Sequence, residues 1–374
     1  MIKAIVAILF SLVLFIGLSA SVLDAIYGGG ESFPDLTQMP IMDSDTLEVV
    51  VDLDYPPGNI SVSNEGRIFF TFHPEAKPPV NIAELVDGKV VPLTLPSEVN
   101  LTSVLSLRVD RQNRLWLLDF ADHGMETPQL VAIDLYTMEL VHHFEFPSDI
   151  AGMGSHLNDF QVSQDGKFVY IADASILRKN PALIVYNVER KTARRLLEGH
   201  DSVKPDYYVP VVENEKMLIF GVFAIRPGVD SIALDRQEKW LYFAPVTDTY
   251  LHRIAISDLR NTNLSPEKLT QKVERFAKKS MSDGITTDDA GNIYISDLEH
   301  TAINRISAEG KFETLLKDPK LRWPDGFSFG PGGWLYVTNS ALNVVIGKPS
   351  SYIMEQGPYQ ILRFKPESSG YPGH

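Results

Sequence analysis

Six segments of the chain repeat one pattern of apolar and polar positions. Each begins with an alternating apolar strand, passes through a tight turn that usually carries Gly or Asn, and continues into a second strand with an aromatic residue near its start. Alternation with a period of two and turn residues of this kind are typical of a β-hairpin. The copies are ISVSNEGRIFF from Ile60, LRVDRQNRLWLLD from Leu107, FQVSQDGKFVYIAD from Phe160, IALDRQEKWLYFAP from Ile232, ITTDDAGNIYISD from Ile285 and FSFGPGGWLYVTN from Phe327.

The spacing of the copies predicts the architecture. The steps between their turns are 47, 53, 72, 53 and 42 residues, measured at Gly66, Asn113, Gly166, Glu238, Gly291 and Gly333. Such steps are typical of four-stranded blades, with one insertion between the third and fourth. The predicted fold class is all-β, a six-bladed β-propeller, whereas a β-sandwich would need six in-register copies by coincidence. We expect an early strand, 46–53, to close the ring against the last blade near 359–365 and so remove exposed sheet edges.

The first residues have the pattern of a targeting segment. Lys3 precedes an apolar run from Ala4 to Leu18, which is followed by small residues. The run is short for a membrane span of about 20 residues, so residues 1–21 are expected to be a cleaved signal peptide or, alternatively, a retained anchor. We therefore expect a secreted or periplasmic protein, or one anchored to a membrane and facing away from the cytoplasm. Residues 22–45 are predicted to be a linker, 46–368 the propeller and 369–374 a tail.

Composition narrows the kinds of partner and site. The formal net charge is -14 and no Lys/Arg stripe follows the chain, so nucleic acid is a poor candidate partner. The chain has no Cys, which excludes disulfides, thiolate metal sites and cysteine nucleophiles. No Walker loop, dinucleotide-binding glycine motif or HExxH motif occurs. We expect a monomer with a small-molecule ligand.

The hairpin register predicts where polar side chains converge. Counting eight residues back from each turn reaches the start of each innermost strand, at the rim of the channel; these residues are Gly58, Leu105, Asn158, Asp230, Asp283 and Asp325. Several carboxylates around one narrow channel repel each other unless a cation or shared protons compensate them. Oxygen ligands without Cys suit Ca²⁺ or Mg²⁺, and Ca²⁺ is the expected ion, held by Asn158, Asp230, Asp283 and Asp325. Alternatively, each of these residues caps a turn.

Other candidate residues lie at the same rim. The second strand of each hairpin returns there and brings Asp119, Asp173, Asp297 and Asn339 near the first set. Asp173 and Asp297 are candidate ligand-binding residues. His156 beside Asn158 is a candidate proton carrier, although a single loop histidine more often has no such role. The insertion from about His200 to Gly228 is expected to roof the channel or simply to pack against it.

Four strings resemble, in combination, the Yellow and major royal jelly protein family. They are TPQLVAIDLYTMELVHHFEFP, LNDFQVSQDGKFVYIADAS, GVDSIALDRQEKWLYFAPV and LRWPDGFSFGPGGWLYVTNSALN, and the likeness runs from about Leu105 to Asn343. The resemblance implies a six-bladed propeller. It also implies functions that range from dopachrome conversion to the binding of aromatic amines, for which Thr338 and Asn339 match a Thr-Asn pair of the amine binders. The absence of Cys departs from the insect members and suggests a bacterial relative.

A more distant likeness is to the gluconolactonase and senescence-marker propellers. That family holds a divalent metal with a Glu, two Asn and an Asp that is also the general base. Asn158 matches the first Asn and Asp283 the Asp, whereas Asp230 lies near the second Asn with a residue change. The Glu is missing, since Asn59 follows Gly58 there, and Asp325 would have to substitute for it.

Three functions remain open, besides a purely structural or protein-binding propeller. The first is a channel that binds a small polar or aromatic molecule together with a divalent cation. The second is a metal-dependent lactonase in which Asp283 activates water, with His156 as a second candidate catalytic residue. The third is a dopachrome-type tautomerase, which moves a proton between a carboxylate and a carbon acid.

Overall fold

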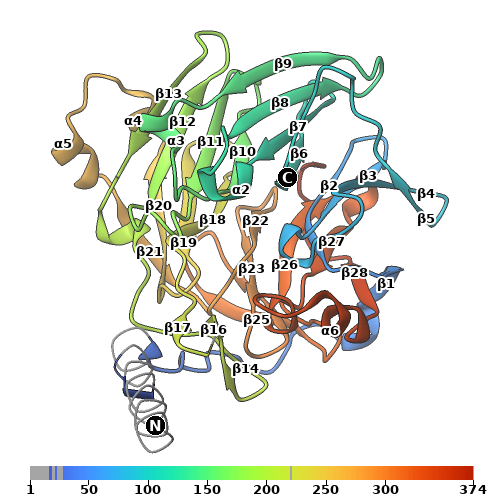
Figure 1. The fold of residues 1–374 in the computed structure, drawn as a ribbon. Helices are drawn as coiled ribbons and strands as arrows, with labels where there is room; N and C mark the ends of the chain where they lie inside the picture. Colours follow the sequence, from blue (N-terminus) through green and yellow to red (C-terminus); the bar gives the residue numbers. More distant parts are fainter. Residues whose placement is uncertain (1–16, 19–21, 23–27, 220, 374) are drawn as a thin grey trace, which may run out of the picture.

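The computed structural model of the protein describes residues 17, 18, 22, 28–219 and 221–373. In this part of the chain, six four-stranded antiparallel sheets stand around a common axis as the blades of a propeller (Figure 1). The predicted six-bladed β-propeller is therefore confirmed. Most of the segment expected to be a signal peptide or anchor, residues 1–21, lies outside the described residues.

Each blade is built from four strands, and its first strand in the following order is the innermost. Blade 1 contains β2 (Pro57–Val62), β3 (Ile68–Phe72), β4 (Ile82–Val86) and β5 (Lys89–Pro92). Blade 2 contains β6 (Val104–Val109), β7 (Arg114–Asp119), β8 (Gln129–Asp134) and β9 (Leu140–Glu145). Blade 3 contains β10 (Leu157–Val162), β11 (Phe168–Asp173), β12 (Ala182–Asn187) and β13 (Thr192–Leu196).

The remaining blades follow the same plan. Blade 4 contains β18 (Val229–Leu234), β19 (Trp240–Pro245), β20 (Tyr250–Ala255) and β21 (Glu274–Lys278). Blade 5 contains β22 (Ile285–Thr287), β23 (Ile293–Asp297), β24 (Ala302–Ile306) and β25 (Phe312–Lys317). Blade 6 contains β26 (Pro324–Phe329), β27 (Leu335–Asn339), β28 (Tyr359–Phe364) and β1 (Glu48–Leu53). The long connection between blades 3 and 4 forms two small hairpins, β14 (Val211–Val212) with β15 (Glu215–Lys216) and β16 (Leu218–Ile219) with β17 (Phe223–Ala224).

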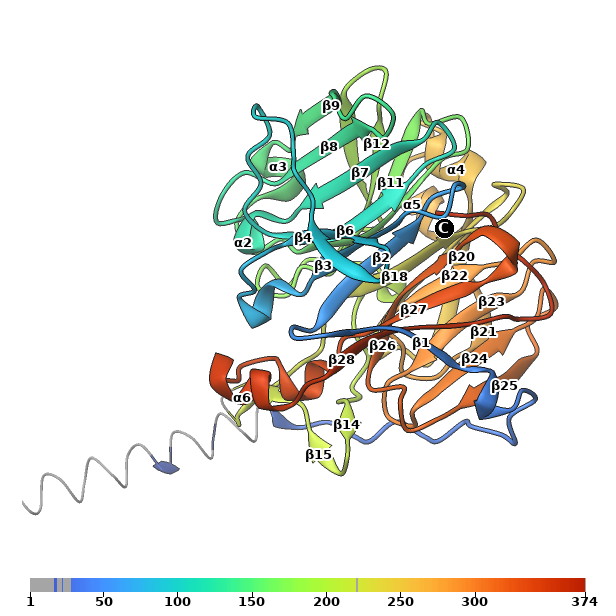
Figure 2. The same cartoon turned by 90° about the vertical axis from the view of Figure 1, so that its right-hand side faces the viewer.

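Short helical segments lie in the loops between strands. They are α2 (Ala121–Gly124), α3 (Ser148–Ala151), α4 (Ile256–Arg260), α5 (Pro266–Thr270) and α6 (Ser350–Glu355). In Figure 2, α2 and α6 lie toward one side of the ring and the C-terminal end of the chain toward the other. We call the side with α2 and α6 the cavity end, and the opposite side, where the hairpin turns lie, the turn end. No helix in the described part of the chain combines the length and apolar character that crossing a bilayer requires.

The ring closes with a strand from the beginning of the propeller. β1 pairs antiparallel with β28, so that Glu48 lies opposite Arg363 and Leu53 opposite Tyr359. Glu48 Oε2 also forms an ion pair of 2.8 Å with Arg363 Nη2. The expected closing strand is thus part of blade 6, and the outer edge of that sheet is formed by residues far from it in sequence.

Apolar side chains fill the space between blades, while small polar side chains join the innermost strands. Trp116 and Phe146 of blade 2 pack in one cluster with Phe160 of blade 3. Near the axis, the Ser61 hydroxyl accepts a hydrogen bond of 2.8 Å from the backbone N–H of Val109 in the next blade. Such hydroxyls satisfy backbone groups that adjacent blades leave without partners, which explains why the buried innermost strands are not uniformly apolar.

The segments on either side of the blades also pack against the propeller. In the expected linker, the N–H of Met42 donates to the carbonyl of Leu315 in blade 5 at 2.9 Å. The expected tail crosses the channel at the turn end, where the Gly373 carbonyl accepts a hydrogen bond from Ser61 Oγ at 3.1 Å. Tyr371 lies between two cations there, its ring centroid 4.1 Å from the guanidinium of Arg111 and 5.4 Å from that of Arg236. Residues 369–373 therefore cover this end of the channel.

Candidate functional site

A β-bulge interrupts five of the innermost strands close to the cavity end. The pairing register shifts at Gly58–Asn59, Leu105, Asn158–Asp159, Asp230 and Asp325–Gly326. In the remaining blade, β22 begins at Ile285, directly after Asp283 and Gly284. Because a bulge re-aims side chains at the end of a strand, it turns these positions toward the axis. The sequence register had selected these same positions.

The bulges also bring the backbones of neighbouring blades into very close contact. A Cβ atom added to Gly284 would lie 1.7 Å from the carbonyl oxygen of Asp325, so no side chain fits there. A Cβ on Gly326 would similarly lie 2.9 Å from the Cα of Asn59. The glycines beside Asp283 and Asp325 thus allow the innermost strands of blades 5, 6 and 1 to converge and place their carboxylates close together.

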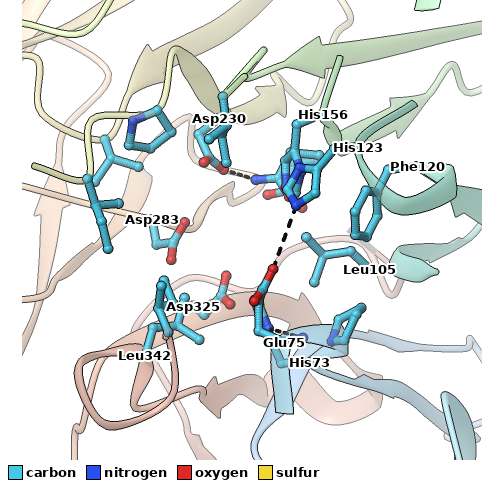
Figure 3. A pocket seen from close by; sticks show the side chains of 18 of the residues that line it. His73, Glu75, Leu105, Phe120, His123, His156, Asp230, Asp283, Asp325 and Leu342 are labelled. Carbon is cyan, nitrogen blue, oxygen red and sulfur yellow. Dashed lines mark hydrogen bonds and ion pairs between the residues drawn. The ribbon is translucent and has the colours of Figure 1, made fainter. Parts of the chain in front are cut away.

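These side chains form the floor of one cavity with a volume of about 290 Å³. Asn158, Asp230, Asp283 and Asp325, the four residues selected by the register, all line it. Figure 3 shows the carboxylates of Asp230, Asp283 and Asp325 turned toward a common space. Asp159 lines the cavity as well, and we call Asp159, Asp230, Asp283 and Asp325 the acidic floor.

Burial and mutual repulsion shift the pKa values of the acidic floor upward. Burial raises the pKa of Asp283 to about 6, with a further increase from the charge of Asp159, even though a 2.7 Å hydrogen bond from Trp323 Nε1 favours the ionised form. Burial and the neighbouring carboxylate of Asp283 raise the pKa values of Asp230 and Asp325 well above the usual range. Burial also raises the pKa of Asp159. These carboxyl groups therefore hold their protons more strongly than ordinary ones, and a bound cation would favour the loss of those protons.

Two buried cations offset part of this charge. Arg108 Nη1 donates to the side-chain oxygen of Asn59 and to the carbonyl of Ile60 at 3.1 Å. Asn59 in turn donates to Asp159 Oδ1 at 2.7 Å. Lys279 is fully buried, its ammonium donates to the carbonyl of Val246 at 2.9 Å, and burial lowers its pKa to about 8. Two buried cations beside four carboxyl groups leave the floor with an excess of acid groups.

Imidazoles and a carboxylate form one wall of the cavity above the floor. His156 Nδ1 lies 3.0 Å from His123 Nδ1, and His123 Nε2 lies 3.7 Å from Glu75 Oε1 (Figure 3). Burial, together with the neighbouring imidazoles, lowers the pKa of His156 to about 3, and burial lowers that of His73 to about 4. Both rings are therefore neutral near pH 7. His156, predicted as a proton carrier, lines the cavity as an uncharged imidazole.

A left-handed turn holds His123 in this wall. Ala121, Asp122, His123 and Gly124 all have positive φ angles, of 51°, 47°, 58° and 69°. Left-handed backbone costs about 1–2 kcal/mol for each residue with a side chain. The Asp119 carboxylate supports the turn by accepting a 2.8 Å hydrogen bond from the N–H of Ala121. Such backbone strain persists only where the surrounding structure maintains it, and it is found most often at functional sites.

The upper walls of the cavity are apolar. They come from blade 2, from the loops after β11, β19 and β27, and from the insertion between blades 3 and 4. The residues are Leu105, Phe120, Ile176, Leu177, Pro210, Ile219, Ile225, Pro227, Val246, Leu342 and Ile346. The expectation that the insertion roofs the channel thus agrees with the position of its hairpins. A molecule in the cavity would contact carboxylates below and hydrocarbon above.

The four predicted ligand-binding residues lie behind the cavity wall, and none of them lines the cavity. Asp173 forms a 2.6 Å ion pair with Arg195, and Asp297 accepts from His300 Nδ1 at 2.8 Å. Thr338 Oγ1 donates to the carbonyl of Gly58 at 2.6 Å, and Asn339 donates to the carbonyl of Lys320. Their polar groups hold loops and bulges in place. We therefore leave Asp173, Asp297, Thr338 and Asn339 out of the site.

The donor set matches a hard divalent cation in chemistry but not in arrangement. Asn158 and the acidic floor supply oxygen atoms, the ligands that Ca²⁺ prefers. Among the described residues, however, no three His, Asp or Glu side chains are grouped so that they could hold a metal ion. Asp230 already accepts a hydrogen bond from the Asn158 amide. Asn59, which stands where the gluconolactonase-type propellers have their Glu, accepts one from Arg108. The floor thus supplies suitable oxygen atoms, but several of them would have to move to hold a cation together.

Comparison with known sequences defines the family of this propeller. A family model described as "Major royal jelly protein" matches residues 102–349, more than half of the chain. The chain belongs to the major royal jelly protein family. The match covers the span from Leu105 to Asn343 over which the resemblance was noted in the sequence.

The curated relatives share part of this royal jelly family propeller. Major royal jelly protein 1 of Apis mellifera is 26% identical over 178 residues, which cover 44% of this chain and 39% of the relative. Major royal jelly protein 7 of the same species is 27% identical over 165 residues, or 41% and 35% of the two chains. The matched region thus spans less than half the length of these relatives.

Solved structures share the fold of this family member at low identity. A regucalcin from Agrobacterium tumefaciens, described as a calcium-binding protein, has a TM-score of 0.56 at 16% identity and covers 87% of this chain and 95% of its own. A gluconolactonase from Xanthomonas campestris has a TM-score of 0.55 at 13% identity, with 90% and 98% covered. At such identities the likeness concerns the fold alone, which agrees with the predicted similarity to those propellers.

Sequence reasoning missed several residues of the site. Asp159 escaped because strict alternation places it opposite Asn158, whereas the bulge brings both to the cavity. Arg108 stands within the second repeat, and its alternation with Leu107 could have placed it near the axis. Glu75 and His123 lie in loops of different blades, and nothing in the sequence indicates that they meet.

Proposed function

We propose that this protein binds, in its central cavity, a small molecule with an apolar body and a positively charged head, the chemical class of an aromatic or aliphatic amine. The observation that carries the proposal is the division of one cavity into an acidic floor, one wall of imidazoles with Glu75, and hydrocarbon upper walls. A cavity of about 290 Å³ is close to the lower end of the usual range for ligand pockets. A ring with a short amine chain is of suitable size.

The electrostatics of the floor support a cationic head. Four carboxylates with raised pKa values face two buried cations, so a third positive charge is favourable wherever it can replace bound protons. An ammonium group offers up to three hydrogen-bond donors, and carboxylate oxygens accept them. Binding is therefore expected to release protons and to strengthen as the pH rises through about 6, where Asp283 ionises.

Calorimetry with a matched pair of ligands tests this proposal. Phenethylamine and 2-phenylethanol have the same ring and chain length but differ in head-group charge. We expect the amine to bind at least about tenfold more tightly, since charge-assisted hydrogen bonds contribute about 1.5–3 kcal/mol. Asp325→Asn should remove most of this preference, and Asp87→Asn, at an exposed turn of blade 1, should leave it unchanged. Equal affinity for the amine and the alcohol would contradict the proposal.

Hydrolysis of lactones with the help of a divalent cation is the second candidate function. The observation in its favour is Asp283, a carboxylate that faces the cavity with a pKa of about 6, close to the value that suits a general base at neutral pH. A bound cation would supply Lewis-acid polarisation of the ester carbonyl, and Asn158 and the acidic floor would have to rearrange to hold it. Metal analysis of the native protein, followed by a panel of sugar lactones with and without chelator, separates this function from amine binding.

A further inference from the structure

Large apolar side chains are exposed at the cavity end. Seven of them lie in the connections between strands at this end, in the insertion and in α6, and we call them the rim set: Met125, Met153, Leu177, Tyr207, Phe223, Tyr352 and Met354. Met153 is 75% exposed and Met125 58%. Among the described residues, the other exposed large apolar side chains lie in the segment before β1, on strands of the blades, or at turns: Leu18, Val22, Met39, Ile41, Val49, Val86, Val90, Val91, Tyr136 and Val141.

The rim set differs from scattered surface hydrophobic residues in its position and composition. Single exposed apolar residues are normal on any protein, but a concentration around one opening indicates contact with a partner or a membrane. Leu177 belongs both to the rim set and to the cavity wall, so the apolar surface continues from the outside into the cavity. Tyrosines at such a rim suit the interface of a bilayer, because one end of the side chain is apolar and the other polar.

The chain segment that precedes the propeller is fixed at this same end. The N–H of Glu31 donates to the carbonyl of Tyr207 at 3.3 Å, and the N–H of Val209 donates to the carbonyl of Glu31 at 3.1 Å. Arg226 also donates to the carbonyl of Gly29 at 3.0 Å. The insertion that carries two members of the rim set thus holds the segment that follows the apolar N-terminal run.

The distance along the chain then limits where a bilayer can lie. The apolar run from Ala4 ends at Leu18, which is 11 positions before Gly29. Even a fully extended chain spans at most about 3.6 Å per residue, or roughly 40 Å over this stretch. A bilayer that contains the apolar run therefore lies within about 40 Å of Gly29, which the insertion holds at the cavity end.

We propose that the cavity end is a membrane-facing surface: the rim set enters the interface of a bilayer, and the cavity opens toward lipid. The bilayer that fits is zwitterionic, because a protein with a net charge of -14 is repelled by anionic lipid. Ligands would reach the cavity from the membrane side. This docking goes beyond the proposed ligand class and does not depend on it.

The absence of Cys allows a site-specific test with the full chain. Met153→Cys places a single thiol in the rim set, and Tyr136→Cys places one at a turn on the opposite end with a similar exposure of 71%. Each variant is labelled with an environment-sensitive fluorophore and reconstituted in phosphatidylcholine vesicles that contain brominated lipid. We expect quenching of the Met153→Cys label to be about threefold stronger than that of the Tyr136→Cys label, since interfacial residues reach the acyl boundary.

Further variants and lipids keep the outcome decisive. Leu177→Glu combined with Phe223→Glu should abolish the difference in quenching while the far-ultraviolet circular dichroism is retained. Replacing a third of the lipid with phosphatidylserine should weaken the quenching at Met153→Cys. Equal quenching at the two sites would overturn the proposal. The proposal would also be overturned if the Met153→Cys label became shielded from water at high protein concentration in the absence of lipid. That result would mean that a second copy of the chain covers the rim set.

Discussion

The substitution Asp283→Asn removes an ionisable group from the acidic floor and leaves its shape nearly unchanged. Asp283 is buried, lines the cavity and accepts a 2.7 Å hydrogen bond from Trp323 Nε1. An asparagine carbonyl oxygen can accept the same bond. The main effect of the substitution should therefore be electrostatic, and its sign depends on pH.

The expected magnitude follows from the pKa of the carboxyl. In the folded protein that pKa is raised from 3.8 to about 6, which corresponds to about 3 kcal/mol at 1.36 kcal/mol per unit. A raised pKa means that the folded state holds the proton more strongly than the unfolded state does. The stability contributed by the neutral carboxyl is thus complete below about pH 4 and is lost as the pH rises through about 6. Asp283→Asn avoids that loss.

Urea unfolding, monitored by tryptophan fluorescence, measures this difference. From about pH 4 to about pH 8, the unfolding free energy of Asp283→Asn should rise relative to the wild type by about 3 kcal/mol. Asp87→Asn is the control, because Asp87 is exposed on an outer turn and its substitution should give a constant offset. A constant offset for Asp283→Asn as well, or a relative loss of stability at high pH, would refute the reasoning.

Other predictions concern packing, the segment that crosses the channel, and proton release. Gly284→Ala should lower the unfolding free energy by about 3 kcal/mol or more, because its Cβ would meet the backbone of Asp325. Gly199→Ala should lower it by only about 1 kcal/mol, because the new Cβ meets open space and only the φ of 73° is unfavourable. Urea titration of both variants checks this difference. Tyr371→Ala should destabilise the protein by about 1–2 kcal/mol through loss of two cation–π contacts, and exposed Tyr136→Ala should be neutral in the same assay. Calorimetry in two buffers of different ionisation enthalpy should detect proton release when phenethylamine binds.

The blades and the floor were predictable because both depend on short-range pattern. A hairpin with period-two alternation fixes which residue lies at the rim, so one count from the turn reached Asn158, Asp230, Asp283 and Asp325 in four blades. The bulges did not upset this count, since they occur at the same position in each innermost strand in which they are found. Because the blades repeat around one axis, equivalent positions in the six hairpins could be predicted to lie near one another.

The rest of the site depends on contacts between distant segments. Asp173 and Asp297 stand at the predicted rim, but their carboxylates are engaged by Arg195 of β13 and by His300 three residues after Asp297, which period-two alternation cannot indicate. His123 reaches the cavity only because a left-handed turn carries it there, and three successive residues with side chains rarely adopt that backbone. A pattern specifies the direction of a side chain in a strand far better than in a loop.

The segment that covers the turn end makes the cavity a dead end. With residues 369–373 across the channel and Tyr371 between Arg111 and Arg236, a molecule that enters from the opposite side must depart by the route it took inward. Capture and escape then share a single barrier at the opening. A substitution that only narrows this opening should slow both processes equally, so residence time would lengthen while the equilibrium affinity stays constant.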